Sequence, residues 1–211
     1  MLVVHHLELS QSERIVWLCE ELELEYELRR YERRADNRLA PEVYKALHPM
    51  GIAPVVSVDD LVLGESAAIC EYINVRFGGG RLAPPPSDPD YPGHLFWFHW
   101  SNATFMATKM MELALALGGG DAGTVPFVAE RSARARDLIE RRLGEAPYFG
   151  GRELTLADIM MVYALTTSRA FSGAPIDHLP NTRVYLRRIG ARAAYKRAMA
   201  KAEPGMEPMI D

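Results

Sequence analysis

Two short stretches of the sequence have the residue types needed to hold a small anionic peptide. In residues 51–56, Pro54 stands at the mouth of an apolar strand, where proline is unusual because it cannot donate a hydrogen bond to a sheet. If the Ala53–Pro54 bond is cis, we expect Val55 to turn its backbone N–H and C=O toward a peptide ligand. Further on, Glu65 and Ser66 open a helical pattern, and the N–H groups and hydroxyl exposed there favour an anion.

A third candidate, Ser10, lies in the loop between the first predicted strand and the first predicted helix. The N-terminus of a helix stabilises an anion through the helix dipole, so a reactive anionic group is favoured at this position. Ser10 and Glu13 also have the spacing of a capping box, and Ser10 could simply cap the helix. Ser12 competes for the same role, and Gln11 or Ser12 could contact a ligand as well.

The elements that must position these residues follow from the hydrophobic periodicity. We expect strand 26–31 to lie near a sheet edge because it is rich in charge, and Glu20 and Glu21 to face water. The order β-α-β-α-β-β-α within residues 1–77 is the thioredoxin-like arrangement. The predicted elements are strand 2–6, helix 15–22, strand 26–31, helix 41–47, a hairpin that turns at 59–60, and helix 66–77.

A second domain is predicted after a Gly- and Pro-rich linker, residues 78–91. In residues 92–211 every periodic stretch indicates helix, so the predicted fold is an α/β domain followed by an all-α domain. Thr155 and Asp158 form a predicted capping box, which makes Asp158 structural. We interpret the arginine-rich stretches 131–142 and 183–197 as solvated faces. The predicted helices are 92–117, 125–143, one that begins at Thr155, 181–189 and 191–202.

Composition and charge exclude several classes of protein. The formal net charge is −4 and the acidic excess lies in residues 1–77, so nucleic-acid binding is not expected. No apolar run is long enough for a membrane span, and the N-terminus lacks the features of a leader, so we expect a cytoplasmic protein. Cys19 and Cys70 fall in apolar helical patterns and are predicted to be buried free thiols. No zinc-binding spacing, no G-x-G-x-x-G motif and no phosphate-binding loop occurs.

Taken together, Ser10, Pro54, Glu65, Ser66 and the two-domain order resemble the soluble glutathione transferases over nearly the whole chain. The resemblance is to serine-type, bacterial-like members. It implies glutathione as co-substrate, no permanently bound cofactor, and a homodimer. It also implies that Ser10, with Ser12 as runner-up, donates a hydrogen bond to the glutathione sulfur and holds it as the thiolate. No cysteine lies in this loop, which argues against thiol-exchange chemistry.

The same resemblance supplies the binding residues. Ile52 departs from the polar residue that relatives often have there, and His48 or Lys45 could replace its contact to the glycyl carboxylate. The hydrophobic electrophile is expected to bind residues of the loop after the first strand and of the first helix of the second domain. The implied glutathione contacts are Gln11, His48, Ile52, Pro54, Val55, Glu65 and Ser66. The predicted electrophile pocket comprises Leu9, Trp100, Phe105, Met106 and Met110.

The predicted function is therefore conjugation of the glutathione thiolate to hydrophobic electrophiles, with the broad tolerance typical of detoxification. Lowering a thiol pKa from about 8.5 by about 2 needs about 2.7 kcal/mol. A charge-assisted hydrogen bond and a helix dipole together supply about that much. A glutathione-dependent isomerase or peroxidase is the alternative on the same scaffold. A non-catalytic glutathione- or ligand-binding module is the alternative from a different class of function.

Overall fold

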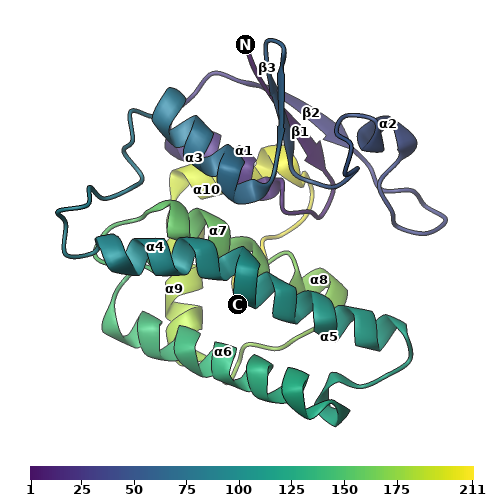
Figure 1. The fold of residues 1–211 in the computed structure, drawn as a ribbon, viewed down its shortest axis with the longest axis vertical. Coiled ribbons are helices and arrows are strands. Elements are labelled where there is room, and N and C mark those ends of the chain that lie inside the picture. The colour runs from purple at the N-terminus through teal and green to yellow at the C-terminus, as the bar shows by residue number, and fades with distance from the viewer. The chain divides into compact units, whose positions relative to one another are not determined.

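The computed structural model describes all residues from 1 to 211 and divides into two compact units. The first unit comprises residues 1–83 and 189–208, and the second comprises 84–188 and 209–211. The predicted boundaries differ from this division, because the prediction places residues 189–208 in the helical domain. The physical reason is that helix α10 (Ala193–Ala202) packs on α1 (Glu13–Glu21) within the first unit (Figure 1).

The first unit contains a mixed four-stranded sheet in the order β2-β1-β3-β4. Strand β1 runs parallel to β2 and antiparallel to β3, and β3 and β4 form the predicted hairpin. The charged strand β2 lies at the edge, as predicted. This is the predicted thioredoxin-like arrangement. Its elements are β1 (Leu2–Leu7), α1 (Glu13–Glu21), β2 (Glu27–Tyr31), α2 (Glu42–Lys45), β3 (Val55–Val58), β4 (Leu61–Gly64), α3 (Ser66–Arg76) and α10 (Ala193–Ala202).

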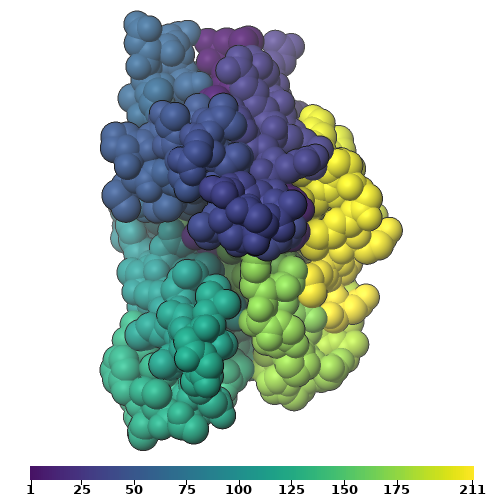
Figure 2. All heavy atoms as spheres, turned by 90° about the vertical axis from the view of Figure 1, so that its right-hand side faces the viewer, coloured from purple at the N-terminus to yellow at the C-terminus, as the bar shows by residue number.

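The α1–α10 contact corrects two expectations about charged residues. Glu20 and Glu21 do not face water, because their side chains are only 7% exposed. Glu20 pairs with Arg197 at 2.9 Å and also with Lys201, while Glu21 pairs with Arg192 at 2.6 Å. The basic residues of this segment therefore neutralise acids on α1 rather than forming a purely solvated face. Figure 2 shows the yellow C-terminal segment beside dark violet-blue residues of the same unit.

The second unit is helical, as predicted. One expected helix, 92–117, is interrupted by a π-helical turn at 101–106, so that three consecutive segments replace it. The short elements α8 and η2 were not predicted. The elements are α4 (Tyr91–Trp100), η1 (Ser101–Met106), α5 (Ala107–Leu117), η2 (Ala122–Thr124), α6 (Pro126–Glu145), α7 (Leu156–Leu165), α8 (Arg169–Ser172) and α9 (Pro180–Ala191), the last of which crosses the boundary between the units.

The core of the second unit is organised around α7, every residue of which is buried. Phe149 is central to it, with its ring 4.9 Å from that of Trp97 and 5.1 Å from that of Tyr185. The predicted capping box at Thr155 and Asp158 is present. None of the helices in the structure has the length and apolarity that a membrane span requires.

Candidate glutathione site and electrophile cavities

The loop that carries Ser10 follows directly from the end of β1. Ser10 is 4% exposed, and its Oγ lies 2.7 Å from Ser12 Oγ and accepts the Ser12 backbone N–H at 3.3 Å. Helix α1 begins at Glu13 with Ser12 as N-cap and without a side-chain capping bond. The capping box between Ser10 and Glu13 is therefore not formed, and the Ser10 hydroxyl is not engaged as a helix cap.

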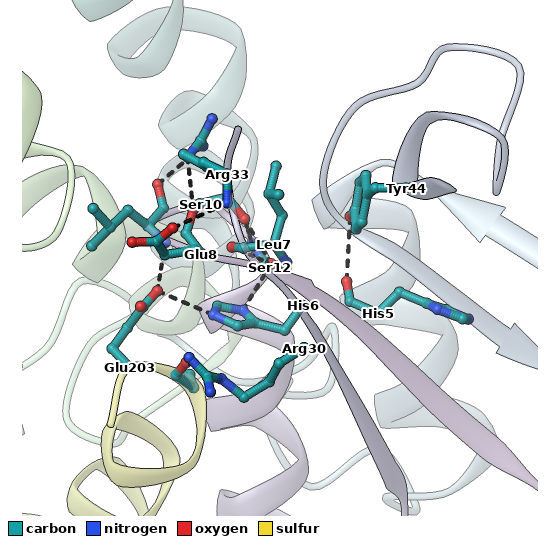
Figure 3. Close-up of polar contacts among 12 residues, drawn as sticks. His5, His6, Leu7, Glu8, Ser10, Ser12, Arg30, Arg33, Tyr44 and Glu203 are labelled. Carbon is teal, nitrogen blue, oxygen red and sulfur yellow. Dashed lines mark hydrogen bonds and ion pairs between the residues drawn. The ribbon is translucent and has the colours of Figure 1, made fainter. Parts of the chain in front are cut away.

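Ser12 is more deeply buried than Ser10 and has no exposed surface. Its Oγ accepts the backbone N–H of Leu7 at 3.0 Å and lies 2.9 Å from His6 Nδ1 (Figure 3). Because these contacts tie Ser12 into the interior of the unit, Ser10 is the serine that lies nearer the surface of this loop.

Arg14 links the Ser10 loop to the start of α3. Its Nη1 donates to Gln11 Oε1 at 2.5 Å and to Ser66 Oγ at 3.2 Å, and the residue is 1% exposed. The structure thus brings Gln11 and Ser66 to the same guanidinium, although 55 residues separate them along the chain. The N-termini of α1 and α3 consequently lie next to each other, and both favour anions.

Glu65 and Ser66 do not form an ordinary helix cap. Glu65 is the N-cap of α3, with φ of 69° and no side-chain capping bond, and its side chain is exposed. Ser66 is the first helical residue and is buried, with its hydroxyl accepting from Arg14. The carboxylate of Glu65 therefore lies beside the N-terminus of α3 without capping its N–H groups.

The Ala53–Pro54 peptide bond is cis. The prediction that Val55 offers its backbone to a ligand is wrong. Val55 is 1% exposed and belongs to β3, where it pairs with His5 on β1 and Gly64 on β4. The Tyr44 hydroxyl donates to the carbonyl of His5, the β1 partner of Val55, at 3.3 Å. Because the strand begins immediately after Pro54, the half-buried residue outside the ladder is Ala53.

His48 and Lys45, the two residues that could replace the contact expected at Ile52, differ in position. Ile52 is 51% exposed and apolar. The His48 ring lies against Gly64, the residue before Glu65, close enough that a Cβ at that glycine would lie 3.3 Å from it. Lys45 Nζ donates to Glu42 at 2.8 Å. Of these two basic residues, His48 is the one that lies against the end of the hairpin, whereas Lys45 is paired with Glu42.

The predicted electrophile residues of the second unit line three different cavities. Met106 and Met110 share a cavity of about 430 Å³ with Tyr163 and Phe171, two aromatic residues that sequence reasoning missed. Phe105 lines an adjoining cavity of about 140 Å³, and Trp100 lines a separate one of about 270 Å³. Leu9 belongs to the first unit, where it borders a cavity of about 500 Å³. Only long-range packing brings Tyr163 and Phe171 to α5, so no local pattern could have found them.

The two cysteines take no part in these sites. Both are buried and free, as predicted. Burial raises the pKa of the Cys70 thiol to about 12 and that of Cys19 further still. Neither is a thiolate at neutral pH. No cluster of three or more His, Cys, Asp or Glu side chains is arranged to hold a metal ion.

The structure joins a thioredoxin-like unit, in which the N-termini of α1 and α3 are linked by Arg14, to an all-helical unit. Two family models match the chain: the glutathione S-transferase N-terminal domain at residues 10–76 and the glutathione S-transferase C-terminal domain at residues 102–193. The chain belongs to the glutathione S-transferase family.

Individual relatives agree with this assignment. Glutathione S-transferase 3 of Schizosaccharomyces pombe is 30% identical over 220 residues, which cover 96% of this chain and 88% of the relative. The crystal structure of a glutathione S-transferase from Actinobacillus pleuropneumoniae has 32% identity and a TM-score of 0.86, covering 98% of this chain and 95% of that one. A sphingomonad glutathione S-transferase solved with glutathione has 20% identity and a TM-score of 0.77, covering 95% and 99%, and shows that the fold is shared.

Proposed function

We propose that this chain binds glutathione at the N-termini of α1 and α3 and holds its sulfur as a thiolate with Ser10. One observation carries the proposal: Arg14 bonds both Gln11 in the Ser10 loop and Ser66 at the start of α3. That contact brings two helix N-termini together into a single site, and each of them favours negative charge. Glutathione has two carboxylates and an ionisable thiol, which match such a site.

Within this site each part of glutathione has a proposed partner. The exposed Glu65 carboxylate receives the γ-glutamyl ammonium, and the N–H groups that open α3 at Ser66 receive the γ-glutamyl carboxylate. The peptide groups of Ala53 replace those of Val55 as partners for the cysteinyl backbone. His48, on the same hairpin end as Glu65, replaces Ile52 as the contact for the glycyl carboxylate.

The chemistry requires Ser10 to donate, not to attack. The thiol proton leaves to solvent, and the Ser10 O–H hydrogen-bonds the sulfur anion without transferring its own proton. The thiolate then forms a C–S bond with the electrophile, which either loses its leaving group or takes up a proton. Charge-assisted hydrogen bonding of about 1.5–3 kcal/mol and a helix dipole of about 0.3–1 kcal/mol are enough to lower the thiol pKa by about 2.

The electrophile is proposed to bind the 430 Å³ cavity of the second unit. Met106, Met110, Tyr163 and Phe171 give it flexible thioether and aromatic walls, which adapt to apolar ligands of varied shape. Isomerase or peroxidase chemistry would use the same thiolate with a different second substrate. The homodimer and the cytoplasmic location stay predictions.

The test is a pH titration of thiolate absorbance for glutathione bound to wild type, Ser10→Ala and the exposed-serine control Ser87→Ala. The expected result is a wild-type thiol pKa well below about 8.5, a return toward that value in Ser10→Ala, and no change in the control. Turnover with an aromatic electrophile should fall about 100-fold in Ser10→Ala. A wild-type thiol pKa at the free value contradicts the proposal.

A further inference from the structure

A row of buried polar side chains connects Ser10 to the segment that follows α10. Ser10 Oγ lies 2.7 Å from Ser12 Oγ, and Ser12 Oγ lies 2.9 Å from His6 Nδ1. On the other side of the ring, His6 Nε2 lies 3.1 Å from Glu203 Oε1 (Figure 3). His6 and Ser12 have no exposed surface and Glu203 is 5% exposed. We call Ser10, Ser12, His6 and Glu203 the serine relay.

Counting protons limits the relay to two arrangements. A hydroxyl donates once and accepts twice, and one acceptor position of Ser12 is filled by the Leu7 N–H at 3.0 Å. The 3.4 Å contact to the Leu7 carbonyl is too long for a good O–H···O bond. Ser12 therefore has one donor and one acceptor position left, which His6 and Ser10 must share.

In the first arrangement Ser12 donates to His6 Nδ1 and Ser10 donates to Ser12, so the Ser10 proton points inward. In the second, His6 Nδ1–H donates to Ser12 and Ser12 donates to Ser10. Ser10 Oγ then accepts twice, from the Ser12 hydroxyl and from the Ser12 N–H at 3.3 Å. Its own proton is left for a ligand. Only the second arrangement suits a serine that donates to a thiolate.

The charge on the His6 ring selects between the two arrangements. The second needs a proton on Nδ1, while Nε2 faces the Glu203 carboxylate and binds it best as a donor. Both nitrogens carry protons only in the imidazolium form. Glu203 Oε1 also accepts the Leu9 N–H at 2.6 Å, which orients the carboxylate toward the ring. The ion pair of His6 and Glu203 therefore corresponds to an outward Ser10 proton.

Other charged groups near His6 are engaged elsewhere. On β2, Arg30 pairs in register with His6, and its Nε donates to the Ala202 carbonyl at 2.9 Å. Arg33, after β2, donates its backbone N–H to Glu8 Oε2 at 3.1 Å and its Nε to the Glu8 carbonyl at 2.8 Å. On β3, the residues paired with β1 are three valines and a serine, none of which titrates in this range. Glu203 is thus the carboxylate that contacts the ring.

We propose that His6 and Glu203 are positioning residues that act through Ser12 to keep the Ser10 proton free for the glutathione sulfur. This inference rests on the proposed function of Ser10. Its consequence is that weakening the contact between His6 and Glu203 returns the relay to the first arrangement and removes the hydrogen bond from Ser10 to the sulfur.

The test compares Glu203→Gln with Glu207→Gln, an exposed glutamate on the same C-terminal segment. A glutamine at 203 can still accept from Leu9, but it favours a neutral His6 ring protonated at Nε2. The expected result is a bound thiol pKa raised by about one and kcat/KM at pH 7 reduced about tenfold. Glu207→Gln should match the wild type in both.

The ring can also be observed directly in the wild-type protein. Nitrogen-15 chemical shifts of His6 should report both nitrogens protonated at pH 7, and a neutral ring at that pH overturns the inference. A Glu203→Gln protein that keeps the wild-type thiol pKa and kcat/KM overturns it as well. If Ser10→Ala itself leaves the thiol pKa unchanged, the proposed function fails, and this result is distinct from a failure of the relay.

A second inference comes from the charges between two adjoining cavities of the second unit. The 140 Å³ cavity is lined by three basic side chains, those of Lys109, Arg136 and Arg169, and by one acid, Glu112. Ser132 donates a short hydrogen bond to Glu112. Arg169 donates to the main-chain oxygens of Ala174, Met209 and Asp211. Positive charge is therefore in excess within this cavity.

Lys109 lies where this cavity meets the larger one, because it lines both, as does Glu112. Its Nζ stands 5.7 Å from the centre of the Phe105 ring. Burial is the main cause that lowers the pKa of its ammonium; Glu112 opposes this effect, and the repulsion of Arg136 and Arg169 adds to it. A ligand that brought a negative charge to this point would relieve that repulsion.

The geometry points to an amphipathic anionic ligand, with an aromatic or aliphatic body in the 430 Å³ cavity and a carboxylate at Lys109. This sharpens the proposed function by naming a class of second substrate, but the binding test needs neither glutathione nor turnover. The probes are 1-naphthaleneacetate and its neutral primary amide, measured by calorimetry on wild type, Lys109→Met and the exposed control Arg134→Met.

The expected result is that the acid binds wild type at least tenfold more tightly than the amide. Lys109→Met should remove this preference, and Arg134→Met should preserve it. Equal affinity of the wild type for acid and amide overturns the inference, as does a Lys109→Met protein that keeps the full preference. Failure of glutathione activation in the Ser10→Ala titration would leave this binding result unaffected.

Discussion

Two helix N-termini in this protein have similar residues but different hydrogen bonds. At the start of α7, the Thr155 hydroxyl accepts the Ala157 N–H at 3.2 Å, and the Asp158 carboxylate accepts the Thr155 N–H at 2.9 Å. At the start of α3, Glu65 makes no side-chain capping bond and is exposed. An acidic residue beside a hydroxyl at a helix start therefore stabilises the helix when its carboxylate accepts hydrogen bonds from the protein. When the carboxylate makes no such bonds, it is available to a ligand.

The α7 cap is also the more deeply buried of the two. Asp158 has no exposed surface and accepts the Phe149 N–H at 2.8 Å and the Tyr185 hydroxyl at 3.0 Å. Glu65 has an exposed carboxylate, and its neighbour Ser66 bonds Arg14 from another helix. Substitutions at α7 should accordingly change stability, and substitutions at α3 should change binding.

The largest expected effect is on stability, in Asp158→Ala. The change leaves the N–H groups of Phe149 and Thr155 and the Tyr185 hydroxyl without their buried acceptor, and we expect the free energy of unfolding to fall by about 3 kcal/mol. Urea denaturation measures it. Glutathione affinity, measured on the folded fraction, should not change. A stability loss below about 0.5 kcal/mol would remove the contrast between the two helix starts.

The pH dependence of stability follows from the same carboxyl. Burial raises the pKa of Asp158 to about 6, from about 3.9 in the unfolded chain. Its contribution to folding is fully present below about pH 4 and is lost as the pH rises to about 6, by about 2–3 kcal/mol. Urea denaturation between pH 4 and 7 should show this slope in wild type. Asp158→Asn, which does not titrate, should flatten it, and an unchanged slope in that variant would assign the dependence to other groups.

At the α3 start, Glu65→Gln should change binding instead. Removing the charge that faces the γ-glutamyl ammonium is expected to weaken glutathione binding about tenfold. Because the carboxylate is exposed and has no capping bond, the free energy of unfolding should change by less than about 0.5 kcal/mol. Calorimetric titration and urea denaturation measure the two quantities. A loss of stability without a loss of affinity would make this helix start structural, like that of α7.

The smallest expected effect is that of Thr155→Ala, which removes one cap hydrogen bond. We expect a loss of about 1 kcal/mol in the free energy of unfolding and an unchanged affinity for glutathione. Thr155→Ser, which keeps the hydroxyl, is the matched control and should retain most of the stability. A Thr155→Ala protein as stable as wild type would mean that the Asp158 half of the capping box suffices alone.

Local features of the chain were predicted well because their causes are local. The capping box of Thr155 and Asp158 depends on a three-residue spacing, and the edge position of β2 follows from its charged residues. The prediction for Val55 failed by a single residue, because whether a strand begins at or after Pro54 depends on its partners His5 and Gly64. The expected helix 92–117 missed the π-helical turn at 101–106, which no residue type in that stretch marks.

Sequence alone determined the two-domain order, the hairpin after Pro54, the helix starts at Ser66 and Thr155, and the family, since periodicity and capping depend on neighbouring residues. Tertiary structure decided which polar groups are satisfied. Arg14 reaches Ser66, and Glu203 reaches His6 across 197 residues, through contacts that no spacing encodes. The residue type is the same whether a serine or a glutamate caps a helix or binds a ligand. Only the packing of distant segments around the side chain determines whether its hydrogen bonds are made within the protein or left for a ligand.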